Sequence, residues 1–222
     1  MRFDIVKYFI EGGWVMWPIL GCSVLGVAFT IERIIVLFLQ KRRLKPDQFL
    51  EALEGSLRKN GGDKDAVVAE MKTLCEKRGG ACGEIMYEGL EKYTQARAMN
   101  LHAFNMRDWL KQAIESRANI ALPQLESHLN VLAACATIAP LLGLFGTVIG
   151  MIQCFEVMAS AAGGAKPDEL AAGISVALIT TAGGLMVAIP ILVLYNWLKA
   201  MIESYVMLIE EAAVHLVDRL IA

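Results

Sequence analysis

Three long stretches without a charged side chain constrain this sequence more than any other feature. They cover residues 12–31, 129–155 and 170–198, which are 20, 27 and 29 positions long. A helix that crosses a bilayer needs about 20 mostly apolar residues, whereas a buried helix of a soluble protein fits an apolar run of about 10–14. The chain is therefore predicted to be an integral membrane protein with three transmembrane helices.

The first stretch has an alternative interpretation as a cleaved signal peptide. The apolar core of a signal peptide is usually about 7–15 residues long and ends at a small-residue cleavage site. Here the apolar character continues past Glu32 and Arg33 as far as Leu39, and Trp14 and Trp17 open the stretch as interfacial residues do. We expect residues 14–39 to be a retained first span.

The basic residues predict the orientation. Four of them follow the first span directly, whereas only Arg2 and Lys7 precede it; the four are Lys41, Arg42, Arg43 and Lys45. The positive-inside rule then places the N-terminus outside and the C-terminus in the cytoplasm. The predicted order is an external amphipathic segment (1–13), span one (14–39), a cytoplasmic helical domain (40–128), span two (129–155), an external loop (156–169), span three (170–198) and a cytoplasmic helical tail (199–222).

The predicted fold is all-α outside the spans as well. Residues 66–77 and 84–117 show helical patterns that are separated near Gly79 and Gly80. Pro123 could kink the approach to span two. Apolar residues recur at helical spacing from Met201 to Leu220, so span three is expected to continue as a long amphipathic helix.

Composition and motifs exclude several classes of function. The formal net charge is −2, from 21 basic and 23 acidic residues, which argues against a global nucleic-acid-binding field. The sequence contains none of the common phosphate-loop, nucleophile-elbow or zinc-protease motifs. A metal site at Cys75, Cys82 and His102 matches no standard zinc spacing, so the five cysteines are expected to be free thiols. We predict neither an enzyme nor a bound cofactor or metal.

Small residues dominate one side of spans two and three. Close helix approach is predicted at Gly143, Gly146 and Gly150 in span two and at Gly173, Ala177 and Gly184 in span three, with Pro140 and Pro190 in the same packing set. Thr147 and Thr181 lie about 12 Å and 16 Å from the outer ends of their spans, at 1.5 Å per residue. They could line one polar level of a pore, although packing alone is an alternative. Thr180 is expected to point about 100° away from Thr181 and to matter less.

Spans two and three carry sequence runs that resemble the proton-channel family of ExbB, TolQ and MotA, and most closely its ExbB/TolQ branch. The runs are Ala-Pro-Leu-Leu-Gly-Leu-Phe-Gly-Thr-Val-x-Gly-Met at 139–151 and Gly-Ile-Ser-x-Ala-Leu-x-x-Thr-Ala-x-Gly-Leu at 173–185, followed by Ala-Ile-Pro at 188–190 and Tyr-Asn at 195–196. MotA proteins have four spans, so the three-span plan disfavours a flagellar stator.

The resemblance implies a function, partners and a location. The subunit would form a homopentamer in the bacterial inner membrane, with a periplasmic N-terminus and a cytoplasmic C-terminus. The pentamer would surround the single span of an ExbD/TolR-like protein and use the proton-motive force to energise a TonB- or TolA-like protein. The alternative is a non-conducting membrane scaffold that assembles a single-span partner.

One position departs from the family pattern. Many ExbB/TolQ sequences have Glu where this chain has Val176, so neither long apolar stretch contains a titratable carboxylate. A proton path through hydrocarbon needs such a group or ordered water. The family's partner is expected to supply an intramembrane Asp. The charges nearest to the spans are Glu32 and Arg33; we expect Glu32 to pair with a cation on a neighbouring helix, and snorkelling to water is the alternative.

Overall fold

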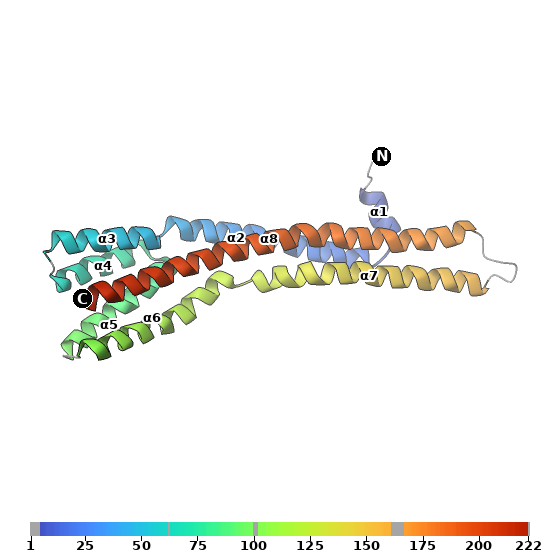
Figure 1. Cartoon of the computed structure of the whole chain (residues 1–222). Coiled ribbons are helices and arrows are strands. Elements are labelled where there is room, and N and C mark those ends of the chain that lie inside the picture. The colour runs from blue at the N-terminus through green and yellow to red at the C-terminus, as the bar shows by residue number, and fades with distance from the viewer. Residues whose placement is uncertain (1–4, 62, 100–101, 161–166, 222) are drawn as a thin grey trace. The chain divides into compact units, whose positions relative to one another are not determined.

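A computed structural model describes residues 5–61, 63–99, 102–160 and 167–221. These residues form helices and no strands (Figure 1), so the all-α prediction is confirmed. The helices are α1 (Ile5–Glu11), α2 (Met16–Arg42), α3 (Pro46–Lys59), α4 (Lys64–Arg78), α5 (Gly80–Ala98), α6 (Ala103–Glu126), α7 (Leu129–Ser160) and α8 (Pro167–Ile221).

Three of the described helices are long and apolar enough to cross a membrane. They are Met16–Gln40 within α2, all of α7, and α8. The prediction of three membrane-spanning helices is confirmed. Helix α7 extends five residues beyond position 155, and α8 begins three residues before position 170. Helix α8 then continues without interruption to Ile221, as the apolar spacing after span three predicts.

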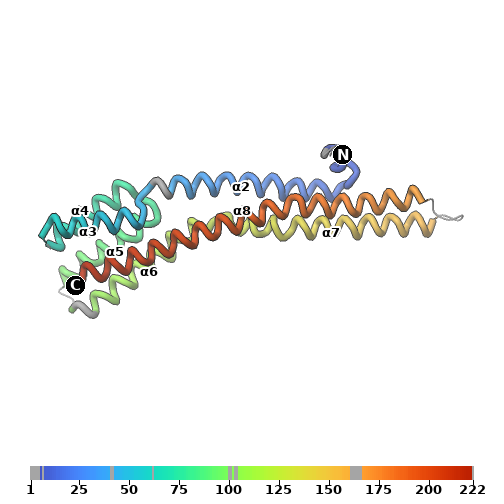
Figure 2. Tube along the Cα trace, turned by 45° about the horizontal axis from the view of Figure 1, so that its top comes forward, coloured from blue at the N-terminus to red at the C-terminus, as the bar shows by residue number. Residues whose placement is uncertain are grey.

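The chain divides into two compact units. The first comprises residues 1–33 and 128–198. In this unit α7 and α8 run side by side in opposite directions, as Figures 1 and 2 both show. The start of α2 packs on this pair, because Val15, Met16 and Ile19 form a buried cluster against Leu142, Ile149, Val187 and Phe9.

The second unit comprises residues 34–127 and 199–222. It is a helical bundle whose buried residues include Leu90 and Tyr93 of α5 and Leu110 and Ile114 of α6. The apolar positions of the end of α8 are also buried in this unit; they include Ile202, Ile209, Ala212, Leu216 and Leu220. The bundle is tied at its surface by ion pairs such as Arg107–Asp218 (2.8 Å) and Arg117–Glu84 (2.7 Å).

The prediction of one helix over residues 84–117 is wrong. Helix α5 ends at Ala98, with Met99 as its C-cap, and α6 begins at Ala103. In one continuous helix, the second half would point away from the first half and could not pack against it. The break lets α6 fold back along α5, so that apolar residues of both helices become buried. Leu101 and the Phe104 side chain, which belong to the predicted apolar stripe, lie outside the described residues.

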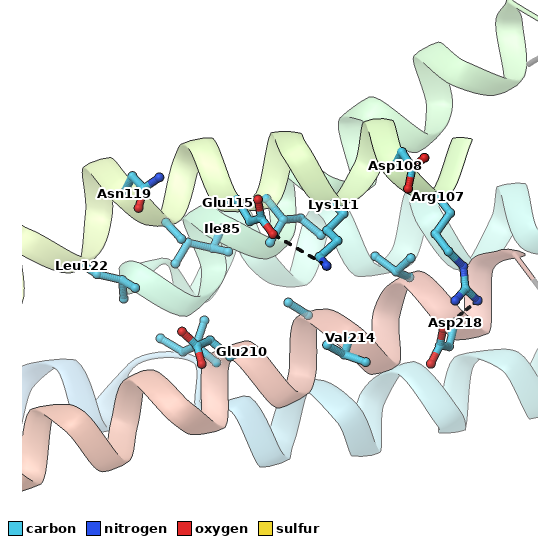
Figure 3. Close-up of a pocket in the computed structure, with 15 residues that line it drawn as sticks. Ile85, Arg107, Asp108, Lys111, Glu115, Asn119, Leu122, Glu210, Val214 and Asp218 are labelled. Carbon is cyan, nitrogen blue, oxygen red and sulfur yellow. Dashed lines mark hydrogen bonds and ion pairs between the residues drawn. The ribbon is translucent and has the colours of Figure 1, made fainter. Parts of the chain in front are cut away.

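A groove of about 650 Å³ separates α6 from the last turns of α8 in the second unit (Figure 3). Its apolar lining includes Ile85, Leu122 and Val214. Charged side chains stand at its edges, where Lys111 pairs with Glu115 at 4.0 Å along α6 and Arg107 reaches Asp218 of α8.

The thiols of Cys75 in α4 and Cys82 in α5 are expected to be chemically inert. Their side chains are 2% and 0% exposed, and burial raises the pKa of each thiol to about 12. Only the thiolate reacts, so at pH 8 about one thiol in 10⁴ is in its reactive form. We expect iodoacetamide to label neither residue in the folded chain and both in sodium dodecyl sulfate, as read by peptide mass spectrometry. Labelling of the folded chain at the rate of an exposed thiol would contradict this burial.

Candidate functional site

The contact between α7 and α8 is built from small residues on both helices. Gly143, Gly146 and Gly150 of α7 are buried against α8, and their positions are three and four residues apart. The facing residues of α8 are Gly173, Ala177, Thr180 and Gly184. Apolar helices gain little hydrophobic free energy by leaving lipid for one another, so close van der Waals packing of this kind holds them together.

The two helix backbones approach each other closely at Gly143 and Gly184. A Cβ atom on Gly184 would lie 2.5 Å from the Ala139 carbonyl oxygen and 3.1 Å from the Gly143 Cα. A Cβ atom on Gly143 would lie 3.0 Å from the Thr180 carbonyl oxygen. These obstacles are backbone atoms, which cannot swing aside as a side chain does. Glycine is therefore required at both positions for this approach.

The same contact continues toward the C-terminal end of α7 and the N-terminal end of α8. A Cβ atom on Gly150 would lie 2.8 Å from the Gly173 carbonyl oxygen, and one on Gly173 would meet the Cys154 sulfur at 2.5 Å. The Cys154 thiol donates a hydrogen bond to the Leu170 carbonyl at 3.4 Å. Both helices thus remain in contact over about four helical turns of α7, from Ala139 to Cys154.

Thr180 lies at the centre of the contact, so the prediction that it points away from this face is wrong. Its side chain is 0% exposed and covers Gly146, whose Cβ position the Thr180 side chain occupies. At about 100° per residue, Thr180 is about 20° from Gly173 around the helix, whereas Thr181 is about 80° away. The spacing of four and then three residues from Gly173 could have identified Thr180.

The two threonines of α8 use their hydroxyl groups differently. Thr180 donates to carbonyls of its own helix, at 3.1 Å to Val176 and 2.9 Å to Ala177. Thr181 is half-buried and donates across the contact to the Gly143 carbonyl at 3.2 Å. The Thr181 hydroxyl is therefore the one that joins α7 to α8.

Thr147 stands apart from this bond. It is half-buried in α7 and donates to the Leu144 carbonyl of its own helix at 2.6 Å. Thr147 and Thr181 thus bind different acceptors, and a shared role in a pore remains a proposal. Pro140 lies half-buried inside α7, and Pro190 lies inside α8 on its exposed side.

Glu32 and Arg33 meet a residue that the sequence does not connect with them. The Arg33 Nη2 atom lies 3.0 Å from Glu32 Oε1 and 3.0 Å from His128 Nδ1. The Glu32 oxygen in turn lies 3.0 Å from the same His128 nitrogen. His128 precedes α7, about 95 residues from this pair. Nothing in the local sequence pattern indicates the contact, which is set by the packing of α2 on α7.

Comparison with known proteins agrees with this arrangement. A sequence model described as the MotA/TolQ/ExbB proton channel family matches residues 80–211, more than half of the chain. The biopolymer transport protein ExbB1 of Vibrio cholerae is 32% identical over 183 residues, which cover 80% of this chain and 72% of that protein. The Tol-Pal system protein TolQ of Haemophilus influenzae is 32% identical over 59% of this chain and 58% of its own length. The matched region contains α7 and the glycine-lined part of α8, and the chain belongs to the MotA/TolQ/ExbB proton channel family, on its ExbB/TolQ branch.

Proposed function

We propose that this chain is the channel-forming subunit of an inner-membrane complex that uses the proton-motive force to energise a TonB- or TolA-like protein. The observation that carries the proposal is the close contact of α7 and α8, in which backbone meets backbone at Gly143 and Gly184. It lies within the region that matches the proton channel family. A tightly packed helix pair of this kind can form one segment of a pore wall.

The protons themselves need a titratable group from elsewhere. No charged residue or histidine occurs at 129–155 or 170–198, and position 176, where the family resemblance leads us to expect Glu, is Val. In our proposal, a homopentamer surrounds the single span of an ExbD/TolR-like protein, whose intramembrane Asp carries the proton. The Thr147 and Thr181 hydroxyls order water or orient that carboxylate, because a hydroxyl both donates and accepts hydrogen bonds.

The proposed orientation has a periplasmic N-terminus and a cytoplasmic C-terminus. The four basic residues that follow the first span support it, since positive charge gathers on the cytoplasmic side. In this orientation the helical bundle of residues 34–127 and 199–222 lies in the cytoplasm. The end of α7 at Ser160 and the start of α8 at Pro167 then face the periplasm, where the energised protein acts.

Co-purification tests the assembly. We expect the chain, expressed with a short single-span protein encoded beside it, to elute in mild detergent as a complex with five copies of the chain, by native mass spectrometry. Reconstituted in liposomes, the complex should pass protons, and changing the partner's intramembrane Asp to Asn should abolish that flux while the complex stays intact. A monomeric chain would refute the proposed pentamer. An intact complex with no proton flux would favour the non-conducting scaffold.

A further inference from the structure

His128 combines an unusual backbone conformation with a crowded side chain. Its φ angle is +64°, a left-handed conformation that no other non-glycine residue in the described part of the chain adopts. It sits at the break between α6, which ends at Glu126, and α7, which begins at Leu129. Non-glycine residues rarely adopt such a conformation, and it persists where the surroundings hold it. Here the contacts of the His128 side chain with Glu32 and Arg33 of α2 surround the break.

The three side-chain atoms around this break form a triangle with all sides at 3.0 Å, between Arg33 Nη2, Glu32 Oε1 and His128 Nδ1. An imidazole nitrogen either carries a hydrogen or offers a lone pair. With a lone pair, Nδ1 accepts from Arg33 but faces the carboxylate oxygen. With a hydrogen, Nδ1 donates to Glu32 but faces the guanidinium N–H. Only two of the three contacts can be hydrogen bonds at one time.

We propose that His128 is a positioning residue whose ring holds the start of α7 to α2. Protonation of the ring replaces its hydrogen bond with Arg33 by a hydrogen bond with Glu32. The neutral ring with its hydrogen on Nε2 is held by Arg33. A proton from solvent then binds Nδ1, and both ring nitrogens become donors. The Arg33 contact is lost, and Glu32 becomes the acceptor of both cations. Histidine as a residue type changes charge between about pH 5 and 8, which sets the two pH values of the test below.

The surroundings of the ring suit this exchange. Among the described residues, the charged groups in hydrogen-bond contact with the ring are Glu32 and Arg33, both from α2. Phe29, one turn earlier on α2, packs its ring against the imidazole with centroids 5.1 Å apart. In the sequence around His128, the nearest carboxylate is that of Glu126, two residues earlier. Arg33 is 4% exposed, whereas the side chains of Glu32 and His128 are 41% and 46% exposed in the chain by itself.

Hydrogen exchange of the first turn of α7 tests the proposal without any transport assay. The Val131 and Leu132 amides donate to the His128 carbonyl at 3.1 and 3.3 Å, so their protection reports on how firmly His128 is held. In the full chain in lipid nanodiscs, Glu32→Gln should lower their protection about fivefold at about pH 5.5 and leave it unchanged at about pH 8, after correction for intrinsic rates. A purely structural role for Glu32 would cost the same protection at both pH values, and that result would overturn the proposal.

A second pair of variants identifies the titrating group. Asn tolerates a positive φ and carries no titratable proton, so His128→Asn should keep the fold. In its background the effect of Glu32→Gln should no longer depend on pH. His102→Asn is the matched control at an exposed histidine, and there the pH dependence should remain. Persistence of the pH dependence in His128→Asn, or its loss in His102→Asn, would refute the assignment to His128.

Discussion

Replacing Gly184 with leucine is expected to abolish assembly of the complex. The new Cβ atom would already lie 2.5 Å from the Ala139 carbonyl oxygen and 3.2 Å from the Gly143 nitrogen, before the rest of the side chain is placed. Overpacking a tight contact costs about 1–3 kcal/mol, and more where backbone must move. No hydrophobic force between helices in lipid compensates for the lost contact. Gly146→Leu should act in the same way, because Thr180 fills the space that the new side chain needs.

The neighbouring glycine provides a matched control. A Cβ atom on Gly183 would meet only the end of the Met16 side chain, at 3.0 Å for its methyl carbon and 3.3 Å for its sulfur. That flexible side chain can move aside. Gly183→Leu should therefore elute like the wild type in size-exclusion chromatography, whereas Gly184→Leu should elute as smaller or aggregated species. Equal elution of all variants at the wild-type position would mean that α7 and α8 do not depend on this contact.

The parts of the fold that follow from local pattern could be predicted from the sequence. The absence of charge over residues 129–155 and 170–198 predicts two spans, since a bilayer excludes charge from such lengths. The continued apolar spacing after residue 198 predicts the long α8, because every helical turn there presents an apolar residue to the same side. In each case the evidence lies within one stretch of chain.

Contacts between distant segments could not be predicted in this way. The break between α5 and α6 lies where the helical pattern is continuous, and only the packing of the two helices on each other favours it. His128 has no sequence relation to Glu32 and Arg33, although it lies 3.0 Å from both. The choice between Thr180 and Thr181 is different in kind, because the spacing of four and then three residues from Gly173 already favours Thr180.

Removing the Thr147 and Thr181 hydroxyls together is expected to abolish proton-motive-force-dependent transport while leaving assembly intact. Valine keeps the shape of threonine, so the packing of α7 on α8 should survive. The one bond lost between the helices is that from Thr181 to the Gly143 carbonyl, at 3.2 Å. Such bonds between membrane helices contribute about 0.6 kcal/mol on average, too little to dissociate the pair. Uptake by cells that carry Thr147→Val with Thr181→Val should fall to that of cells lacking the gene.

Thr180→Val separates this pore role from simple packing. The Thr180 hydroxyl is satisfied within its own helix, and its side chain is 0% exposed over Gly146. Valine fills the same volume and presents its methyl groups to the same glycine, so transport should remain near the wild-type level. Thr180→Leu, in contrast, should disrupt assembly, because Gly146 leaves no room for a longer side chain. If the Thr147 and Thr181 double variant transports normally while Thr180→Leu fails to assemble, these threonines act only by packing, and protons must pass along some other polar surface.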